Sequence, residues 1–354
     1  MGFSAAEQRA MRRAIELART PGVPLGPNPR VGCVLLAPDG TTVAEGYHRG
    51  AGTAHAEAVA LAEAGPDARG ATAVVSLEPC HHTGRTGPCS LALIEAGVGR
   101  VVFAQPDPNL VATGGEAALR EAGIAVEFGL LEREARALNR AWTFAMEHHR
   151  PFVTWKYAAT LDGRSAAADG TSRWITSRAA RIDSHRLRAQ CDVVLVGTGT
   201  VEADDPELTV RDEYDGVLPH QPLRAVMGLR QLDRSRRVFN DAAETVRLET
   251  AEPREALAQL HARDRQHVFL EGGPHLAAAF LRAGLVDEVV GYLAPALLGA
   301  GSNAVADLGI ATIADAQRLQ LAEAVTVGTG SETNVRITMT PMRSTHHSTP
   351  LGRD

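Results

Sequence analysis

A histidine, two cysteines and a glutamate form the pattern in this sequence with the most specific chemistry. His55 and Glu57 stand in an H-x-E arrangement, and Cys80 and Cys89 each follow a proline downstream. One imidazole and two thiolates would give zinc three tetrahedral ligands and leave the fourth position for water, whose pKa the metal lowers. The glutamate in such a site stays off the metal and moves protons. The pattern therefore predicts zinc on His55, Cys80 and Cys89, with hydrolytic deamination as the chemistry.

A structural zinc knuckle is the alternative interpretation of the same residues. That kind of site closes its coordination with a fourth protein ligand. The remaining cysteines are Cys33 and Cys191, and neither belongs to a ligand-spaced pair. We therefore expect a catalytic site with an open position, in which Glu57 is the general acid and base.

The elements that must hold these residues alternate between helices and strands. The expected order is helix 4–19, strand 31–36, a second strand near Val43, helix 55–64, strand 73–77, a helix that opens at 88–89, strand 101–104 and helix 115–122. This order is typical of an α/β sandwich around a central sheet. It places His55 and Cys89 at helix starts and Cys80 just past a strand. The positive end of a helix dipole favours thiolate and so suits metal binding.

Length and composition limit the kind of protein this is. A chain of 354 residues favours two domains, each large enough for its own core. The formal charge of -6, from 36 basic and 42 acidic residues, argues against a nucleic-acid partner. Four cysteines do not make a disulfide framework, and there is neither a signal-peptide pattern nor an apolar run of about 18 residues. We expect a cytoplasmic protein with no membrane span.

The loop between the two cysteines separates this sequence from ordinary deaminases. It is eight residues long, whereas the common deaminase signature has two residues at this place. The loop is basic and polar, as a lid over a phosphorylated substrate would be. The segment 78–89 (EPCHHTGRTGPC), with the H-x-E pattern before it and Asp-Pro-Asn at 107–109 after it, resembles the deaminase half of the bifunctional riboflavin-biosynthesis deaminase–reductases. The segments 28–32 and 46–48 match the same family.

The resemblance implies a cytidine-deaminase-like α/β/α sandwich. In that family a zinc hydroxide removes the exocyclic amine of a diaminopyrimidinone ribosyl phosphate, which assigns the proton transfers to Glu57. By position, the implied substrate contacts are Asn28, His48, Arg85, Asp107 and Asn109. Taken singly, these residues have ordinary interpretations, such as a turn residue for Asn28 or a packing histidine for His48.

The second half of the chain forms another alternating series. Residues 130–150 are charged and helical with one apolar stripe, and Pro151 disfavours helix just before itself. We place the boundary here, with domains at 1–149 and 150–341 and a disordered tail at 342–354. Strands are expected at 152–157, 192–196, 223–227, 245–248, 267–270, 288–293, 319–326 and 334–340, and helices at 176–189, 253–263 and 273–283. This order predicts a second α/β domain with its own sheet.

Two glycine-containing turns in this half are candidates for nucleotide binding. The segment 197–202 begins like a dinucleotide fingerprint but lacks its third glycine, which makes the signal weak. The segment 271–274, Glu-Gly-Gly-Pro, follows an apolar strand and opens a helix, where backbone N–H groups and the helix dipole bind phosphate. An ordinary strand-to-helix turn is the alternative.

Segments 160–163, 174–177, 203–211 and 285–288 resemble the reductase half of the same family. The resemblance implies a dihydrofolate-reductase-like α/β fold in which NADPH reduces the ribosyl group to ribityl. The implied NADPH contacts are Ala158, Trp174, Thr200, Asp204, Gly273, Pro274, His275 and Leu276. The implied substrate contacts are Ser172, Arg188, Leu208, Arg211 and Glu271, with Lys156 and Glu271 nearest the reacting carbon. Guanidinium groups such as those of Arg188 and Arg211 bind phosphate bidentately, although a solvated charge is the ordinary interpretation.

Met227-Gly228-Leu229 departs from the family, which commonly ends this strand with an aspartate and a small polar residue that help hold the cofactor. Two rival functions stay open. One is a nucleoside or tRNA deaminase with an unrelated second domain, and the other is a working deaminase whose second half only binds nucleotide or supports an oligomer. The charge and the cysteine loop oppose the first rival, and the departure favours the second. We expect a homo-oligomer, a dimer or tetramer, that acts on a small phosphorylated pyrimidine with Zn2+ and NADPH as cofactors.

Overall fold

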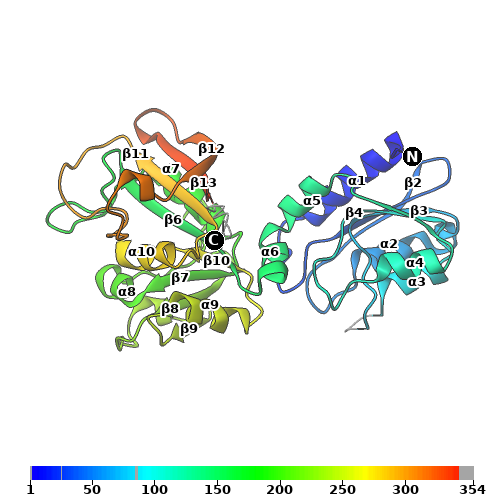
Figure 1. Ribbon diagram of the computed structural model, residues 1–354, viewed down its shortest axis with the longest axis horizontal. Coiled ribbons are helices and arrows are strands. Elements are labelled where there is room, and N and C mark those ends of the chain that lie inside the picture. The colour runs from blue at the N-terminus through cyan, green and yellow to red at the C-terminus, as the bar shows by residue number, and fades with distance from the viewer. Residues whose placement is uncertain (1, 25, 84–86, 343–354) are drawn as a thin grey trace, which may run out of the picture. The chain divides into compact units, whose positions relative to one another are not determined.

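A computed structural model describes residues 2–24, 26–83 and 87–342 of the chain. Arg85 and residues 343–354 of the expected tail lie outside the described residues. The chain divides into two compact units. The first consists of Met1–Pro151 and Leu260–Gln266, and the second of Phe152–Gln259 and His267–Asp354. Each unit has its own sheet (Figure 1).

The first unit is built on a five-stranded sheet in the order β2-β1-β3-β4-β5. Its strands are β1 (Gly32–Leu36), β2 (Thr42–Tyr47), β3 (Thr72–Leu77), β4 (Arg100–Gln105) and β5 (Ala125–Phe128). β1 pairs antiparallel with β2 and β3, whereas β3, β4 and β5 run parallel. Parallel neighbours end at the same edge of a sheet, so the segments that follow β3 and β4 lie next to each other.

Helices cover both faces of this sheet (Figure 1). They are α1 (Ala5–Ala18), α2 (Ala56–Ala64), α3 (Cys89–Glu95), α4 (Gly115–Glu121), α5 (Glu132–Leu138) and α6 (Arg140–His148). Successive residues of a strand point to opposite faces. Val74 of β3 accordingly packs in a core with α1 and α5, while Ala73 and Val75 pack in a core with α2, α3 and α4. The expected α/β/α sandwich is confirmed.

The helical stretch expected over residues 130–150 is interrupted in the structure between α5 and α6. The junction is Asn139, whose side chain accepts a hydrogen bond from the Arg30 backbone N–H at 2.9 Å and donates one to the Arg30 carbonyl at 2.8 Å. Asn139 thereby ties the junction to the segment before β1. The apolar stripe could not reveal this break, because the two partners are 109 positions apart in the sequence.

The second unit has an eight-stranded sheet in the order β12-β13-β11-β6-β10-β7-β8-β9. Its strands are β6 (Phe152–Thr160), β7 (Val193–Gly197), β8 (Leu223–Met227), β9 (Thr245–Leu248), β10 (His267–Leu270), β11 (Glu288–Ala294), β12 (Leu319–Val327) and β13 (Asn334–Pro341). The strands from β11 to β9 are parallel, and β13 and β12 extend the sheet by antiparallel pairing. The expected second α/β domain is confirmed.

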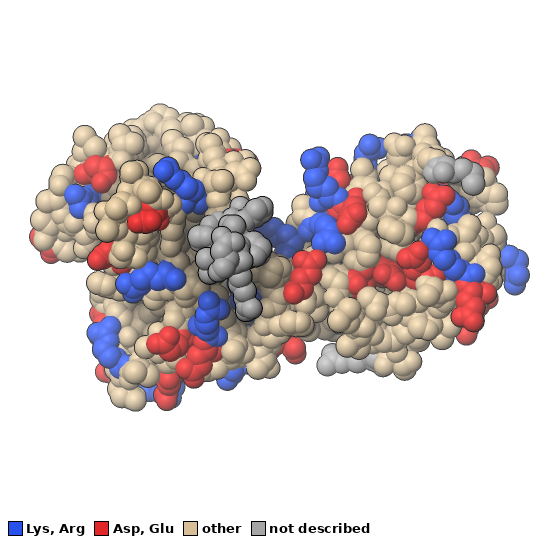
Figure 2. All heavy atoms as spheres, viewed as in Figure 1, with Lys and Arg blue, Asp and Glu red and all other residues tan. Residues whose placement is uncertain are grey.

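The remaining helices are α7 (Arg178–Arg188), α8 (Thr198–Asp204), α9 (Pro253–His261) and α10 (Pro274–Arg282). Short 3-10 helices occur at Gly65–Ala68, Arg237–Phe239, Ile313–Asp315 and Gly330–Glu332. None of the helices in the described part of the chain has the length and apolar character that crossing a bilayer requires. On the face shown in Figure 2, acidic and basic side chains are interspersed, in keeping with the small net negative charge.

Gly46 of β2 packs directly against α2, the helix that begins after His55. An added Cβ atom at Gly46 would lie 2.2 Å from the Ala56 carbonyl oxygen and 2.7 Å from the Ala60 nitrogen, and both are backbone atoms. We expect Gly46→Val to displace α2, to lower the free energy of unfolding by about 1–3 kcal/mol, and to weaken metal retention. Thermal unfolding and elemental analysis for zinc measure the two effects.

Gly2→Ala is the control for this substitution, because an added Cβ atom there meets nothing within 4 Å. A Gly46→Val protein with the melting temperature and zinc content of Gly2→Ala would contradict the tight packing of β2 on α2.

Candidate functional site

The side chains of His55, Cys80 and Cys89 meet at one place in the first unit. Their ligand atoms all lie within 4.8 Å of one another, and they form the only such group of three found in the described part of the chain. His55 is the N-cap residue of α2, Cys89 opens α3, and Cys80 follows β3. The His55 Nδ1 lies 3.2 Å from the Cys89 Sγ and 3.5 Å from the Cys80 Sγ, so Nδ1 is the nitrogen that faces the thiols. One nitrogen and two sulfurs at this spacing fit zinc with one coordination position left open.

The two thiols shift each other's pKa in opposite directions. A hydrogen bond from Cys89 lowers the pKa of Cys80, and the neighbouring His55 adds to this effect while burial opposes it. The same hydrogen bond, together with burial, raises the pKa of Cys89. A metal that binds both sulfurs must displace the remaining thiol proton, which makes metal affinity depend on pH.

Glu57 lies in the first turn of α2 and is only 3% exposed. Burial raises the pKa of this carboxyl to about 7, although a backbone hydrogen bond and the charge of His55 oppose the shift. A carboxyl with a pKa near neutrality can both accept and release a proton at neutral pH, as general acid–base catalysis requires. A cation in the neighbouring metal site would lower this pKa.

A pocket of about 410 Å³ opens beside the metal ligands. Four of the predicted substrate contacts line it, namely Asn28, His48, Asp107 and Asn109. The His48 Nδ1 lies 3.1 Å from the Ala54 carbonyl oxygen, so this nitrogen carries the proton and donates it. The His48 Nε2 then accepts a hydrogen bond from the Asn28 side-chain amide at 3.0 Å. This pair orients the Asn28 amide at the pocket.

Glu78, the first residue of the segment 78–89, positions neighbouring segments of the pocket, a role that was not predicted from the sequence. Its buried carboxylate accepts the Asp107 backbone N–H at Oε2 and the Glu116 backbone N–H at Oε1, both at 3.1 Å. Glu78 therefore holds the turn after β4 and the start of α4 against the segment that carries Cys80. Burial, with the charges of Glu78 and Cys80 added, raises the pKa of Asp107 to about 7, although the Asn109 backbone N–H opposes the shift. A polar residue directly after a buried strand was the signal that could have identified Glu78.

Further residues line the same pocket. His82, in the loop expected to act as a lid, is one of them, whereas the His81 Nδ1 lies 2.8 Å from the Ser90 Oγ. Asp264 and Gln266 also line it, from the segment Leu260–Gln266 that belongs to the first unit. No local pattern near residue 260 could have indicated this, because the association depends on contacts made only in the folded chain.

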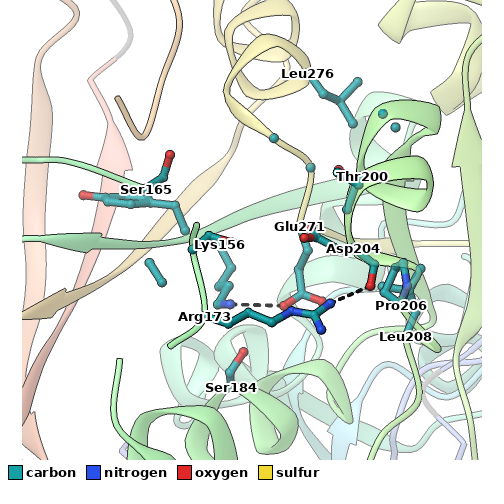
Figure 3. A pocket seen from close by; sticks show the side chains of 18 of the residues that line it. Lys156, Ser165, Arg173, Ser184, Thr200, Asp204, Pro206, Leu208, Glu271 and Leu276 are labelled. Atoms are coloured by element: carbon teal, nitrogen blue, oxygen red, sulfur yellow. Dashed lines mark hydrogen bonds and ion pairs between the residues drawn. The ribbon is translucent and has the colours of Figure 1, made fainter. Parts of the chain in front are cut away.

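In the second unit a cavity of about 1330 Å³ opens along β6 and at the carboxyl ends of β7, β8 and β10. It brings together every contact predicted for this half of the chain. These residues are Lys156, Ala158, Ser172, Trp174, Arg188, Thr200, Asp204, Leu208, Arg211, Glu271, Gly273, Pro274, His275 and Leu276. Figure 3 labels six of them, Lys156, Thr200, Asp204, Leu208, Glu271 and Leu276.

Glu271 is the centre of an ion cluster in this cavity. Its Oε2 lies 2.6 Å from the Arg188 Nη2. Its Oε1 lies 3.4 Å from the Lys156 Nζ, the pair joined by a dashed line in Figure 3. β6 and β10 pair in parallel with Trp155 opposite Leu270, which places the next residues, Lys156 and Glu271, side by side. Burial by itself raises the pKa of Glu271, but the charges of Arg188 and Lys156 outweigh burial and lower the pKa. Glu271 is therefore a fixed negative charge at neutral pH.

Two glycine-containing segments also line the cavity, one at the start of α10 and one after β8. Gly273 is the N-cap residue of α10, and the residues Gly272–Leu276 line the cavity, so the positive end of this helix is available to a phosphate group. Gly228 has a φ of 133°, and an added Cβ atom there would lie 2.9 Å from the Thr198 Oγ1. Arg230 donates a hydrogen bond to the same oxygen at 3.2 Å and forms an ion pair with Glu202 at 2.5 Å. The size of the cavity, its helix N-terminus and its cations fit a phosphorylated dinucleotide such as NADPH.

Two family profiles match the chain. The family described as cytidine and deoxycytidylate deaminase zinc-binding region matches residues 4–105, and the RibD C-terminal domain matches residues 151–332. The riboflavin biosynthesis protein RibD of Mycobacterium tuberculosis is 50% identical over 303 residues, which cover 85% of this chain and 89% of that protein. The riboflavin biosynthesis protein RibD of Escherichia coli is 41% identical over 352 residues, which cover 90% of this chain and 96% of that protein.

Solved structures agree with these matches. Acinetobacter baumannii RibD superposes with a TM-score of 0.88 at 37% identity, over 96% of this chain and 99% of that chain. A diaminohydroxyphosphoribosylaminopyrimidine deaminase/5-amino-6-(5-phosphoribosylamino)uracil reductase from Thermotoga maritima has a TM-score of 0.83 at 33% identity, over 95% of this chain and 99% of that chain.

Replacing Cys89 by serine tests the metal ligands. We expect the unaltered protein to hold about one zinc per chain, because the donor set forms a single site. Loss of a residue that only hydrogen-bonds to a metal ligand costs about 10–100-fold in metal affinity. Loss of a ligand itself, as in Cys89→Ser, should lower the metal affinity by at least as much. Elemental analysis after dialysis and titration with a competing chelator measure the loss. Cys191→Ser, at a buried cysteine of the second unit, should retain zinc, and a Cys89→Ser protein with unchanged zinc affinity would refute the ligand assignment.

Proposed function

The chain belongs to the RibD family of riboflavin biosynthesis proteins, and from this premise we propose which residues perform its two reactions. It is a bifunctional enzyme of riboflavin biosynthesis, a hydrolase that deaminates and an oxidoreductase that reduces. Family membership removes the rival of a nucleoside or tRNA deaminase with an unrelated second domain. The substrate is a diaminopyrimidinone ribosyl phosphate, and the observation that carries the assignment is that each unit assembles a complete set of candidate reacting groups.

The deamination site consists of His55, Cys80 and Cys89 as zinc ligands and Glu57 as the general acid and base. Zinc, when bound, supplies the Lewis acidity that activates a water molecule for attack on an amine-bearing carbon. Glu57 accepts a proton from that water and delivers it to the ring and the departing amine, because its carboxyl lines the pocket from the first turn of α2, two residues after His55.

Substrate binding in this site falls to Asn28, His48, Asp107 and Asn109, with Arg85 contributing from the cysteine loop. The first four line one pocket beside Glu57, and their orientations are fixed by hydrogen bonds to backbone or to each other. Such preorganisation lets the ring be held without rearrangement of the pocket. Arg85 suits the substrate phosphate, since guanidinium binds phosphate bidentately.

The reduction site is the cavity around Glu271. NADPH, when bound, supplies the hydride. Lys156 and Glu271 lie at the reacting end of the substrate, where the ammonium group of Lys156 can hydrogen-bond an oxygen or nitrogen of the opened ribosyl group. Ser172, Arg188, Leu208 and Arg211 bind the remainder of the substrate, and the two arginines are suited to its phosphate.

The cofactor contacts are Ala158, Trp174, Thr200, Asp204, Gly273, Pro274, His275 and Leu276. The start of α10 binds cofactor phosphate through backbone N–H groups. Met227 and Gly228 lack the polar side chains usual in the family, so the contact there is made by backbone and by the neighbouring Thr198 and Arg230.

We further propose that the protein forms a homo-oligomer, a dimer or tetramer, through the β12–β13 edge of the second unit. β12 is the outermost strand of its sheet, and Leu319 and Leu321 on it are 37% and 60% exposed. An edge strand with exposed leucines is a ready site for association with another chain.

Leu321→Glu tests this interface. A buried carboxylate without a partner is costly, so the variant should shift the protein to a smaller species in sedimentation velocity at micromolar concentration. Leu110→Glu, at an 87% exposed leucine of the first unit, is the control and should leave the species distribution unchanged. Identical sedimentation of Leu321→Glu and the unaltered protein would place the interface elsewhere.

The two active sites are tested by a pair of carboxylate-to-amide variants. Glu57→Gln should reduce ammonia release by about 100- to 10,000-fold, because the amide cannot carry a proton, and should leave NADPH oxidation on the deaminated intermediate intact. Glu271→Gln should show the reverse pattern, with NADPH oxidation down by about 10- to 100-fold, since hydrogen bonds to charged groups contribute about 1.5–3 kcal/mol.

The controls are Glu132→Gln in the first unit and Glu323→Gln in the second, whose side chains are 40% and 51% exposed and pair with Arg136 and Arg336. Both should retain both activities. A Glu57→Gln protein that still deaminates would overturn the acid–base assignment, and an unaltered protein that never oxidises NADPH would leave the second unit as a binding module.

A further inference from the structure

One face of α7 lines the reductase cavity. It carries Arg188, which is assigned to the substrate, and other polar side chains that have no assigned role. Arg181, Ser184, His185 and Arg188 all line the cavity, and they stand at the three- and four-residue intervals that share a helix face. Arg186, between them in sequence, is exposed and is not among the lining residues. The roles of Ser184 and His185 are not explained by the reaction as described above.

Ser184 has a buried hydroxyl that the protein does not satisfy. The residue is 6% exposed, and its Oγ finds no hydrogen-bond partner among the described residues. A serine inside a helix commonly bonds to the carbonyl four residues earlier, but this one does not. A buried hydroxyl without a partner costs about 1–3 kcal/mol, so it is expected to have a partner in some functional state. Figure 3 shows the hydroxyl directed from α7 toward the side of the cavity that holds Lys156 and Glu271.

One ring nitrogen of His185 accepts a hydrogen bond from the protein, and this fixes the tautomer of the imidazole. Its Nδ1 accepts a hydrogen bond from the Arg211 backbone N–H at 3.2 Å. Burial, with the nearby charge of Arg188 added, lowers the pKa of His185 to about 4. The imidazole is therefore neutral at physiological pH, and its proton is on Nε2, which makes it an uncharged donor beside two arginines.

Both residues line the cavity next to groups assigned to the substrate. Arg188, one turn after Ser184 on α7, binds Glu271, which in turn contacts Lys156. His185 contacts the segment of Arg211, whose side chain also lines the cavity. The ribosyl phosphate chain carries hydroxyl groups between its reacting carbon and its phosphate. Hydroxyl groups both donate and accept hydrogen bonds, as a serine Oγ and an imidazole N–H require.

We propose that Ser184 and His185 form a subsite of the reductase cavity that binds the hydroxyl groups of the substrate's ribosyl chain. The Ser184 Oγ and the His185 Nε2–H hold the middle of the chain while Lys156 and Glu271 face its reacting carbon and the arginines face its phosphate. This subsite rests on the proposed reductase function and adds the contacts that distinguish a polyhydroxylated chain from a plain alkyl phosphate.

Ser184→Ala tests the subsite through two opposed effects. It removes an unsatisfied buried hydroxyl, so the melting temperature should stay level or rise. The KM for the deaminated pyrimidine ribosyl phosphate should rise by about three- to tenfold, the range expected for one hydrogen bond, while the KM for NADPH stays unchanged. A serine with a purely structural role would give the reverse result, a lower melting temperature with an unchanged KM, and that result would overturn the proposal.

His185 supplies a rescue test. Glutamine can accept the Arg211 N–H through its oxygen and donate through its nitrogen, so His185→Gln should keep a KM within about twofold of the unaltered enzyme. His185→Leu should raise the substrate KM by about three- to tenfold, and an unchanged KM in His185→Leu would remove His185 from the subsite. Arg186→Ala, on the exposed face of the same helix, is the matched control for both kinetic parameters.

Two simple inhibitors distinguish binding of the chain's hydroxyl groups from binding of its phosphate. Ribose 5-phosphate should inhibit NADPH oxidation more strongly than inorganic phosphate does, and Ser184→Ala should lose part of that difference. Equal differences in Ser184→Ala and the unaltered enzyme would count against the subsite even if the variant's KM changed. Ammonia release by the same preparations should not change. An unaltered enzyme without NADPH oxidation would instead refute the reductase function itself, so the two failures are distinguishable.

Discussion

Parallel strand pairing is the constraint on which both sites depend. Neighbouring parallel strands end at the same edge of a sheet, so residues that follow them meet without any sequence proximity. In the first unit β3 and β4 bring the Cys80 segment beside the Asp107 turn, and Glu78 joins the two by hydrogen bonds to backbone. In the second unit the register of β6 with β10 sets Lys156 against Glu271. A shift of one residue in either register would turn these side chains to the opposite face.

The two carboxyls proposed to act in catalysis show how the environment gives the same chemical group different properties. Glu57 and Glu271 are both buried, but burial dominates at Glu57 and raises its pKa, whereas two cations reverse the effect at Glu271 and lower its pKa. A carboxyl with a raised pKa suits proton transfer, and a carboxylate held between Arg188 and Lys156 suits the fixing of charges and positions. Removal of either partner would leave a buried charge uncompensated, so the Glu271 cluster also ties its three side chains to a single arrangement.

The close approach of a glycine backbone to a neighbouring segment is the second feature that shapes both units. Gly46 lets β2 reach α2 and so supports the helix that presents His55 and Glu57. Gly228 gives the cofactor wall a surface of backbone where the family usually has polar side chains, and its positive φ is one that glycine adopts without strain. The departure at Met227 and Gly228 thus changes the chemistry of the wall while the cavity, the α10 N-terminus and the ion cluster remain assembled.

The sequence by itself determined the two α/β folds and predicted the zinc ligands and the further site residues, which stay predictions. His55, Glu57, Cys80 and Cys89 could be identified because their residue types and short spacings carry the chemistry directly, and the alternation of apolar segments predicted two sheets. Only the tertiary structure decided the break at Asn139, the role of Glu78, the membership of Leu260–Gln266 in the first unit, and the unsatisfied hydroxyl of Ser184. The physical reason is that partners, burial and side-chain direction depend on strand register and packing between segments far apart in the chain, which no local spacing records.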